Sequence, residues 1–234
     1  MHWGWSVNAV SRRQEILEGK RYSISEAARL AGTSPQNARR WLLGYDAPGH
    51  RMLPVFGQTA RGETPRLSFL ELIELAVVAR FRSSTGSHPI PLERLRAAHR
   101  FARQQLRVEH PFASRKLLVE GGHVLYEFER QYPGTGRLAL DLQGQRVLPG
   151  VVLEELRQMD FDDKSGLVLR WFPWGREAPV VLDPERGGGR PVIQGTNVRA
   201  EVIRARFDSG ESIQELADDF EIGVPAVEAA LRAA

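Results

Sequence analysis

The chain has 234 residues, of which 42% are hydrophobic and 26% charged. This composition is usual for a globular protein with room for two or three small domains. The absence of cysteine excludes disulfides, thiolate metal sites and cysteine catalysis. No stretch approaches the roughly 18 apolar residues of a membrane span, and the first residues lack the pattern of a signal peptide. We therefore expect a cytoplasmic protein.

The formal net charge of +3 is unevenly distributed. Residues 1–110 carry +8, residues 111–177 carry −1 and residues 178–234 carry −4. A polyanion is attracted to clustered lysine and arginine, so the basic first half predicts nucleic-acid binding. The acidic final segment does not favour a polyanion.

Residues 1–21 form an N-terminal extension in this interpretation. Val10 to Leu17 predicts a short helix that ends at Gly19. Trp3 and Trp5 either pack on the protein or on another chain, or belong to a frayed end.

Tyr22 to Tyr45 predicts two short helices joined by a tight turn, as in a helix-turn-helix. We expect Ser25 to cap the first helix and Gly32 to end it. Ser34 and Pro35 then open a second helix with a capping hydroxyl and a proline at its first position. Ala38 and Trp41 supply its buried face. A helical hairpin that never contacts DNA is the alternative.

A loop rich in proline and glycine, residues 44–66, follows the second helix. A short strand over Met52–Phe56 is predicted within it, in the position of a wing, with Arg51 and Arg61 facing a DNA backbone. A plain surface loop is the alternative. The residues expected to contact bases or phosphates are Ser34, Gln36, Asn37, Arg39, Arg40 and Arg51.

Two amphipathic helices are predicted next, over Leu67–Arg82 with Ser68 as its cap, and over Leu92–Leu106. From Tyr22 to about Leu106 the chain resembles the MerR-like DNA-binding domain. The resemblance rests on Tyr22-Ser23-Ile24-Ser25-Glu26-Ala27-Ala28 and Arg39-Arg40-Trp41. It implies a winged helix-turn-helix domain over residues 22–110. The long coiled coil and cysteine-based sensor of the metal-responsive regulators are missing.

The middle segment, residues 111–177, alternates short apolar runs with turns and predicts an α+β region. Strands are expected at Leu117–Val119, Val124–Phe128, Leu138–Leu140 and Gly166–Phe172, and a helix at Val151–Met159. Gly121-Gly122 would form a hairpin turn between the first two strands. The aromatic cluster Trp171, Phe172 and Trp174 is either core packing or a binding surface.

The C-terminal segment, residues 178–234, begins with a strand at Val180–Asp183 and a glycine-rich turn and hinge, Asp183–Gly189. The hairpin-like unit Pro191–Val198 follows. Helices are then expected from Arg199 to Asp208, from Ile213 to Phe220 with Ser212 as cap, and from Val224 onward. The last two helices form a second helix-turn-helix shape whose outward residues are mostly acidic. Such a unit favours protein contacts over DNA contacts.

This segment closely resembles a small three-helix family, a domain of unknown function that is found in VapB-type antitoxins. The resemblance is carried by Asp183-Pro184, Gly189–Ile193, Gly195-Thr196, Val198, Gly210–Ile213, Glu215–Ala217, Phe220, Val227, Ala230 and Leu231. Arg199-Ala200 replaces a proline that is frequent in the family. With the MerR-like segment, it resembles long VapB-type antitoxins over most of the chain. The resemblance implies that the protein neutralises a PIN-like ribonuclease toxin and represses the shared promoter. Because one helix-turn-helix reads a short site, we expect a homodimer on an inverted repeat.

No catalytic, metal-binding or cofactor-binding residues are predicted. The six histidines show no metal-ligand spacing, and no serine lies in a nucleophile elbow. The adjacent pairs Asp162-Asp163 and Asp218-Asp219 are interpreted as solvated turns or helix ends.

The overall prediction is a mainly α protein with small β elements, an α+β fold, acting as a DNA-binding antitoxin. The residues expected at a partner or dimer interface are Trp171, Trp174, Ile193, Phe207, Phe220, Val227 and Leu231. One alternative is a stand-alone MerR-like transcriptional regulator, with an effector or dimerisation domain. A second is a protein-interaction adaptor that has lost DNA binding.

Overall fold

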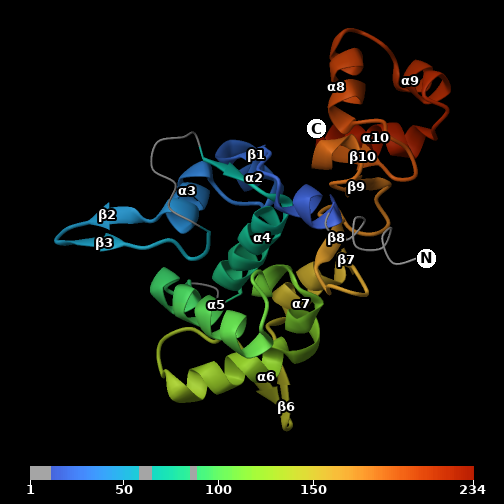
Figure 1. Cartoon of the computed structure of the whole chain (residues 1–234). Helices are drawn as coiled ribbons and strands as arrows, with labels where there is room; N and C mark the ends of the chain where they lie inside the picture. The colour runs from blue at the N-terminus through green and yellow to red at the C-terminus, as the bar shows by residue number, and fades with distance from the viewer. Residues whose placement is uncertain (1–11, 58–64, 85–88) are drawn as a thin grey trace, which may run out of the picture. The chain divides into compact units, whose positions relative to one another are not determined.

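The computed structural model describes residues 12–57, 65–84 and 89–234. Its architecture is α+β, as the sequence predicts: helices predominate and the strands form short antiparallel sheets (Figure 1). The chain divides into two compact units. Of the described residues, the large unit comprises 19–57, 65–84, 89–157 and 161–168, and the small unit comprises 12–18, 158–160 and 169–234. Among the described residues, no helix is long and apolar enough to cross a membrane.

The large unit begins with strand β1 and three further short strands that accompany its first helices. Strand β1 pairs antiparallel with β4, and β2 with β3. The elements, in chain order, are β1 (Tyr22–Ser23), α2 (Ile24–Leu30), α3 (Pro35–Leu43), β2 (Tyr45–Ala47), β3 (His50–Met52) and β4 (Arg66–Leu67). We call the β2–β3 hairpin, residues 45–52, the wing.

Longer helices complete the large unit. They are α4 (Phe69–Ser83), α5 (Leu92–Leu106), the 3-10 turn η1 (Pro111–Ala113), α6 (Arg115–Gln131) and α7 (Gly150–Arg157), with the hairpin β5 (Leu140–Leu142) and β6 (Gln145–Val147) before α7. A capping box between Ser68 and Glu71 starts α4. Helix α4 is buried around most of its circumference and packs against α2, η1 and α7. It is the central helix of this unit.

A buried ion cluster lies at the middle of α4. The carboxylate of Glu74, 1% exposed, accepts from His99 Nε2 at 2.8 Å and from the backbone N–H of Phe112 at 3.3 Å, and it lies 3.2 Å from His110 Nδ1. It thereby links α4 to α5 and η1. Burial raises the pKa of Glu74, but the two histidines outweigh it and lower this pKa to about 2. Burial lowers the pKa of His110, and the Glu74 carboxylate reverses that effect, so the net shift is upward.

The middle of the chain contains the main error of the sequence interpretation. Leu117–Val119 and Val124–Phe128 are not strands, and Gly121-Gly122 is not a hairpin turn; all of them lie in α6. The buried residues of α6 recur at helical spacing, and the two glycines allow a close approach rather than a turn. A Cβ on Gly122 would lie 2.1 Å from the carbonyl oxygen of Arg146 in β6. The β5–β6 hairpin therefore packs directly on the α6 backbone.

Three smaller predictions also need correction. Ser23, not Ser25, caps α2, because its hydroxyl accepts from the backbone N–H of Glu26 at 3.2 Å. The strand expected over Met52–Phe56 is instead β3, which ends at Met52; Val55 and Phe56 are buried core residues. The strand expected over Leu138–Leu140 begins only at Leu140.

The other predicted helices and strands are confirmed within a few residues. Helix α5 spans Leu92–Leu106 as expected, and Ser68 caps α4. A helix occupies residues 12–18, the described part of the one expected from Val10. Trp3, Trp5 and Arg61 lie outside the described residues.

The small unit combines a sheet with three helices. The strands are β7 (Met159–Phe161), β8 (Val168–Trp171), β9 (Val180–Leu182) and β10 (Pro191–Ile193), in the order β10-β9-β8-β7. The chain crosses from the small unit to the large unit within β7, after residue 160, and returns within β8, after residue 168. A glycine-rich turn containing η2 (Gly187–Gly189) links β9 to β10. The helices are α8 (Ala200–Asp208), α9 (Ile213–Asp219) and α10 (Val224–Ala233).

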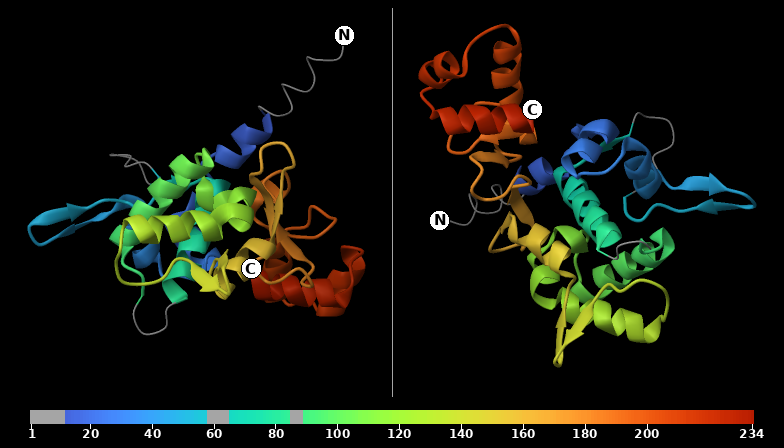
Figure 2. Two further views of the ribbon diagram at one scale, coloured as in Figure 1. Left: turned by 90° about the horizontal axis from the view of Figure 1, so that it is seen from below. Right: turned by 180° about the vertical axis from the view of Figure 1, so that it is seen from behind.

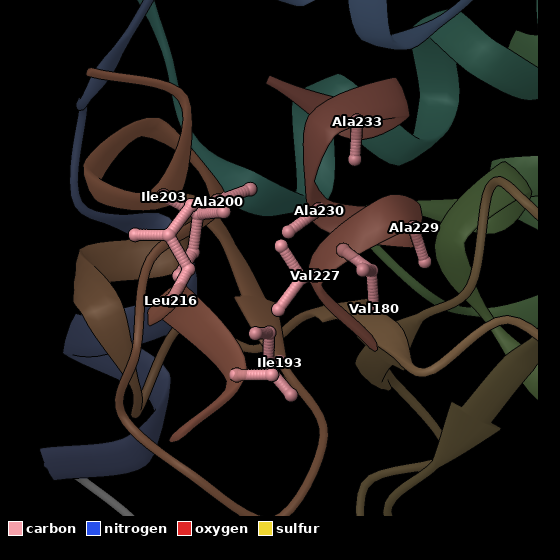
Figure 3. Close-up of a cluster of buried hydrophobic side chains, with 10 residues drawn as sticks. Val180, Ile193, Ala200, Ile203, Leu216, Val227, Ala229, Ala230 and Ala233 are labelled. Carbon is pink, nitrogen blue, oxygen red and sulfur yellow. The ribbon is translucent and has the colours of Figure 1, made fainter. Parts of the chain in front are cut away.

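The core of the small unit lies between β9, β10 and the three helices. Val180 and Ile193 on the strands face Ile203, Leu216 and Val227 on the helices (Figure 3). The alanines of this core lie mainly on α10, where small side chains let the helix pack closely. Burying these apolar side chains, at about 25 cal/mol per Å², supplies the main driving force for folding of this unit.

The Glu74 cluster predicts a pH optimum of stability. The lowered pKa of Glu74 contributes stability above its unfolded value of 4.5, and this contribution is lost as the pH falls toward about 2. The raised pKa of His110 contributes stability below its unfolded value of 6.5, and this is lost as the pH rises above it. The melting temperature of the large unit should therefore be highest between the two unfolded values, pH 4.5 and pH 6.5.

Glu74→Gln should lower the unfolding free energy by about 3 kcal/mol, because it removes one member of a buried ion cluster. It should also flatten the dependence of melting temperature on pH. Glu120→Gln, at an exposed position on α6, is the matched control and should change neither property. An unchanged pH profile in Glu74→Gln would contradict this account of the cluster.

Candidate nucleic-acid interface

Helices α2 and α3 cross closely because their contact is built from alanines. Ala28, Ala31 and Ala38 are fully buried, and Trp41 is 3% exposed beside them. The turn between the helices passes through Gly32 at a φ of 66°, a left-handed conformation that glycine adopts without strain. The helix pair is therefore held by its sequence as a rigid unit.

The exposed face of α3 carries hydrogen-bond donors and positive charge. Ser34 caps the helix by accepting from the backbone N–H of Asn37 at 3.1 Å, which leaves its hydroxyl hydrogen able to donate. Gln36, Arg39 and Arg40 are exposed, and Asn37 is half-buried. Among the described residues, the side chain of Arg39 makes no hydrogen bond or ion pair. Arg39 can therefore reach a ligand without first breaking such a contact.

The wing follows α3 directly, and its register pairs Tyr45 with Met52 and Asp46 with Arg51. The guanidinium of Arg51 lies 3.1 Å from the Asp46 carboxylate and also donates to the carbonyl of Leu43 at 3.5 Å. Arg51 is thus turned toward the end of α3. Because its charge is shared with Asp46, it offers a weaker phosphate contact than Arg39.

Tyr45 was not predicted as a site residue, but it joins α3 to the wing. The guanidinium of Arg40 lies over its ring, 5.3 Å from the centroid. The one sequence feature that could have pointed to Tyr45 is its position directly after Gly44, at the end of a predicted helix.

Gly44 is the backbone joint between α3 and the wing. Its φ of 72° and ψ of −173° lie in a region that is essentially restricted to glycine. A Cβ at this position would lie 2.1 Å from the carbonyl oxygen of Met52. Only glycine therefore lets the hairpin fold back against the end of α3.

The second helix-turn-helix shape, α9 and α10, has the opposite charge. Ser212 and Glu215 form a capping box at the start of α9, as the position of Ser212 predicts. Its exposed carboxylates include Asp218, Glu221 and Glu228. Arg206 of α8 is bound by Glu211 and Asp219, so its charge is neutralised locally. This face lacks the donors and positive potential that a duplex requires.

The predicted interface residues of the small unit fall into three classes of exposure. Trp171, Ile193 and Val227 are buried in the core. Trp174, Phe220 and Leu231 are partly buried against it. Phe207 on α8 is 37% exposed.

The residues described here contain no group of three His, Asp or Glu side chains placed to bind a metal ion. In the Glu74 cluster, the two carboxylate oxygens are each bound by a ring nitrogen, one from His99 and one from His110.

Comparison with known proteins gives similarity over different parts of the chain. Residues 180–233 match the family DUF433, whose description is "Protein of unknown function". The match lies in the C-terminal segment, where a family of unknown function was expected. Two proteins of Mycobacterium tuberculosis match most of the chain. One, named "Putative antitoxin VapB45", is 29% identical over 214 residues, covering 85% of this chain and 87% of the relative. The other, "Uncharacterized protein Rv2308", is 23% identical over 219 residues, covering 92% and 90%.

A solved structure shares the fold. The crystal structure of Rv2018 from Mycobacterium tuberculosis is 26% identical, covers 91% of this chain and 97% of its own, and superimposes with a TM-score of 0.72. The similarity therefore extends across both units and is not confined to the DUF433 segment.

Gly44→Ala should displace the wing, because the added methyl group meets backbone and the required φ is strained. We expect a loss of about 2 kcal/mol or more of stability, measured as a lowered melting temperature, and faster hydrogen exchange of the wing amides. Gly49→Ala, at the tip of the wing, where an added methyl group would have no other atom within 4 Å, should cost about 1 kcal/mol. Equal effects of the two substitutions would contradict the assignment of Gly44 as the joint.

Proposed function

We propose that this protein is the antitoxin of a type II toxin–antitoxin pair. In this proposal it neutralises a PIN-like ribonuclease toxin and binds operator DNA to repress its own operon. The observation that carries the proposal is the similarity to the protein named "Putative antitoxin VapB45", which covers more than four fifths of both chains. A match of that extent cannot be confined to the acidic C-terminal segment, residues 178–234.

The DNA-binding part of the proposal is supported by the surface of α3. Gln36 and Asn37 are suited to hydrogen-bond adenine edges in a major groove, and Arg39 and Arg40 to bind guanine or phosphate. The N-terminus of α3, with the Ser34 hydroxyl, is suited to a phosphate. We propose that this segment acts as a MerR-like winged helix-turn-helix, with α3 in the groove and Arg51 of the wing at the backbone.

The partner-binding part is supported by the charge and chemistry of the small unit. The helix pair α9–α10 is acidic and therefore unsuited to DNA. On α8, the apolar side chains of Val202 and Phe207 are 41% and 37% exposed. We propose that this unit engages the toxin or a second copy of the chain. One helix-turn-helix reads a short site, so a homodimer on an inverted repeat fits this proposal.

Replacing Arg39 and Arg40 together by alanine should abolish specific binding to the DNA upstream of the protein's own gene. Each lost base contact costs about 1–3 kcal/mol, so affinity should fall by about 100-fold or more at fixed salt. Fluorescence anisotropy with labelled duplex measures the effect. Arg130→Ala on α6 is the control for charge alone, because it removes an exposed arginine whose one partner in the described part of the chain is Glu127. Unchanged affinity in the double variant would overturn the placement of α3.

Co-expression with the protein encoded by the neighbouring frame should rescue growth arrest, and the two chains should co-purify. Phe207→Asp should weaken the co-purification, because it places a charge on the exposed apolar surface of α8. Val119→Asp, at a position 74% exposed on α6 of the large unit, is the matched control. Normal DNA binding without rescue or co-purification would favour a stand-alone transcriptional regulator instead.

A further inference from the structure

Arginines from three helices lie in this part of the large unit, next to the wing. Arg40 of α3 lies over the ring of Tyr45, 5.3 Å from its centroid, and Arg96 of α5 reaches the two carbonyls that follow Met52, the strand partner of Tyr45. Arg82, near the end of α4, reaches the carbonyl of Ile90 just before α5. Arg100 follows one turn after Arg96 on α5 and is close enough to repel it. In Figure 1 and in the right-hand view of Figure 2, α5 lies on the same side of α4 as α3 and the wing.

Backbone carbonyl groups hold two of these arginines in place. Arg82 donates to the carbonyl of Ile90 at 2.5 Å. Arg96 donates to the carbonyl of Pro54 at 2.8 Å and also to that of Leu53, immediately after the wing. These bonds fix the guanidinium groups without neutralising them, since a carbonyl carries no net charge. The side chains are therefore pre-organised and still cationic.

The wing carboxylate next to the cluster, Asp46, is paired with Arg51. Among the groups that act on Arg96, Glu93 is the one carboxylate, whereas Arg100 disfavours its charge. Burial lowers the pKa of Arg82 and of Arg96, so their desolvation also opposes the charged state. Within the described residues, the side chain of Arg100 makes no hydrogen bond or ion pair. Like charges concentrated without counter-charges destabilise the fold unless an anion binds between them.

We propose that Arg40, Arg82, Arg96 and Arg100, with the Tyr45 hydroxyl, form a phosphate clamp that binds the DNA backbone beside the wing. This inference rests on the proposed DNA-binding function and extends it: α5 becomes a third contact element beside α3 and the wing, and the footprint extends past the wing. The clamp contacts phosphodiester oxygens and carries no base specificity. It adds affinity at every sequence, in contrast to Gln36 and Asn37.

The test uses the full chain and two duplexes, one from the gene's upstream DNA and one of random sequence, titrated over a range of KCl concentrations. Arg100→Gln should lower the slope of log K against log salt by about 1 on both duplexes and weaken binding roughly five- to tenfold near 0.1 M salt. Tyr45→Phe should also weaken binding, and the loss of affinity should be equal for the two duplexes. Arg130→Gln is the control, since among the described residues its guanidinium pairs with Glu127 alone, on α6.

Inorganic phosphate, added as a competitor, separates a DNA clamp from a site for the free anion. If millimolar phosphate displaces DNA from the wild type no better than chloride at equal ionic strength, the phosphodiester is the ligand. Phosphate that competes specifically, and fails to do so in Arg100→Gln, would show a free-anion site and overturn the assignment to DNA.

The inference and the proposed function fail in different ways. If Arg39→Ala/Arg40→Ala binds upstream DNA normally, the proposed function is wrong. If that double variant loses binding while Arg100→Gln behaves like Arg130→Gln, the clamp alone is wrong. Arg100 has no hydrogen-bond or ion-pair partner among the described residues, so its substitution should leave the melting temperature unchanged, and the binding data report the contact itself.

Discussion

The large unit depends on one buried carboxylate. Glu74 lies at the middle of α4, a helix that is apolar around most of its surface, and it is bound by His99, His110 and the backbone of Phe112. Because an unpaired charge at such a position would cost several kcal/mol, α5 and η1 must dock with the two histidines in place. The same packing fixes Arg96 of α5 against the segment after the wing. The stability of the core and the position of the basic surface are therefore coupled.

The two helix-turn-helix shapes show that geometry alone does not define a DNA-binding motif. Both pairs have a serine cap, buried alanines at the crossing and a tight turn. They differ in what their exposed faces carry: Arg39 and Arg40 on α3, against Asp218, Glu221 and Glu228 around the α9–α10 turn. A phosphate backbone repels the second set and attracts the first. The proposal of one DNA-reading pair and one partner-binding unit follows from this difference in charge.

The sequence predicts the elements that are determined locally. Ser68, Ser34-Pro35 and Ser212 mark helix starts through capping chemistry that acts within one turn, and all three hold in the structure. The error at α6 arose because its β-branched and aromatic residues suit strands, whereas tertiary packing decides the outcome. Gly121 and Gly122 are typical of turns, yet Gly122 serves to admit Arg146 of β6. That contact joins segments far apart along the chain and cannot be read from local pattern.

The part of the candidate nucleic-acid interface that lies on α3 was predictable, because it too is determined locally. The α3 residues face outward because helical periodicity and the burial of Ala38 and Trp41 require it. The cluster at Tyr45 draws on α3, α4, α5 and the wing, which only the tertiary fold brings together. The exposed α8 surface around Phe207 was among the expected interface residues, but Trp171, Ile193 and Val227 lie in the core. Alternating patterns identify apolar residues without separating a core from a binding surface.

The division of roles between the two helix-turn-helix shapes is the central claim, and site-specific photo-crosslinking tests it most directly. A crosslinking amino acid is placed at Gln36 on α3 or at Glu228 on α10, both exposed, in the full chain bound to the upstream DNA of its gene. The account predicts crosslinks to DNA from position 36 and none from position 228. DNA crosslinked from position 228, with none from position 36, would contradict it.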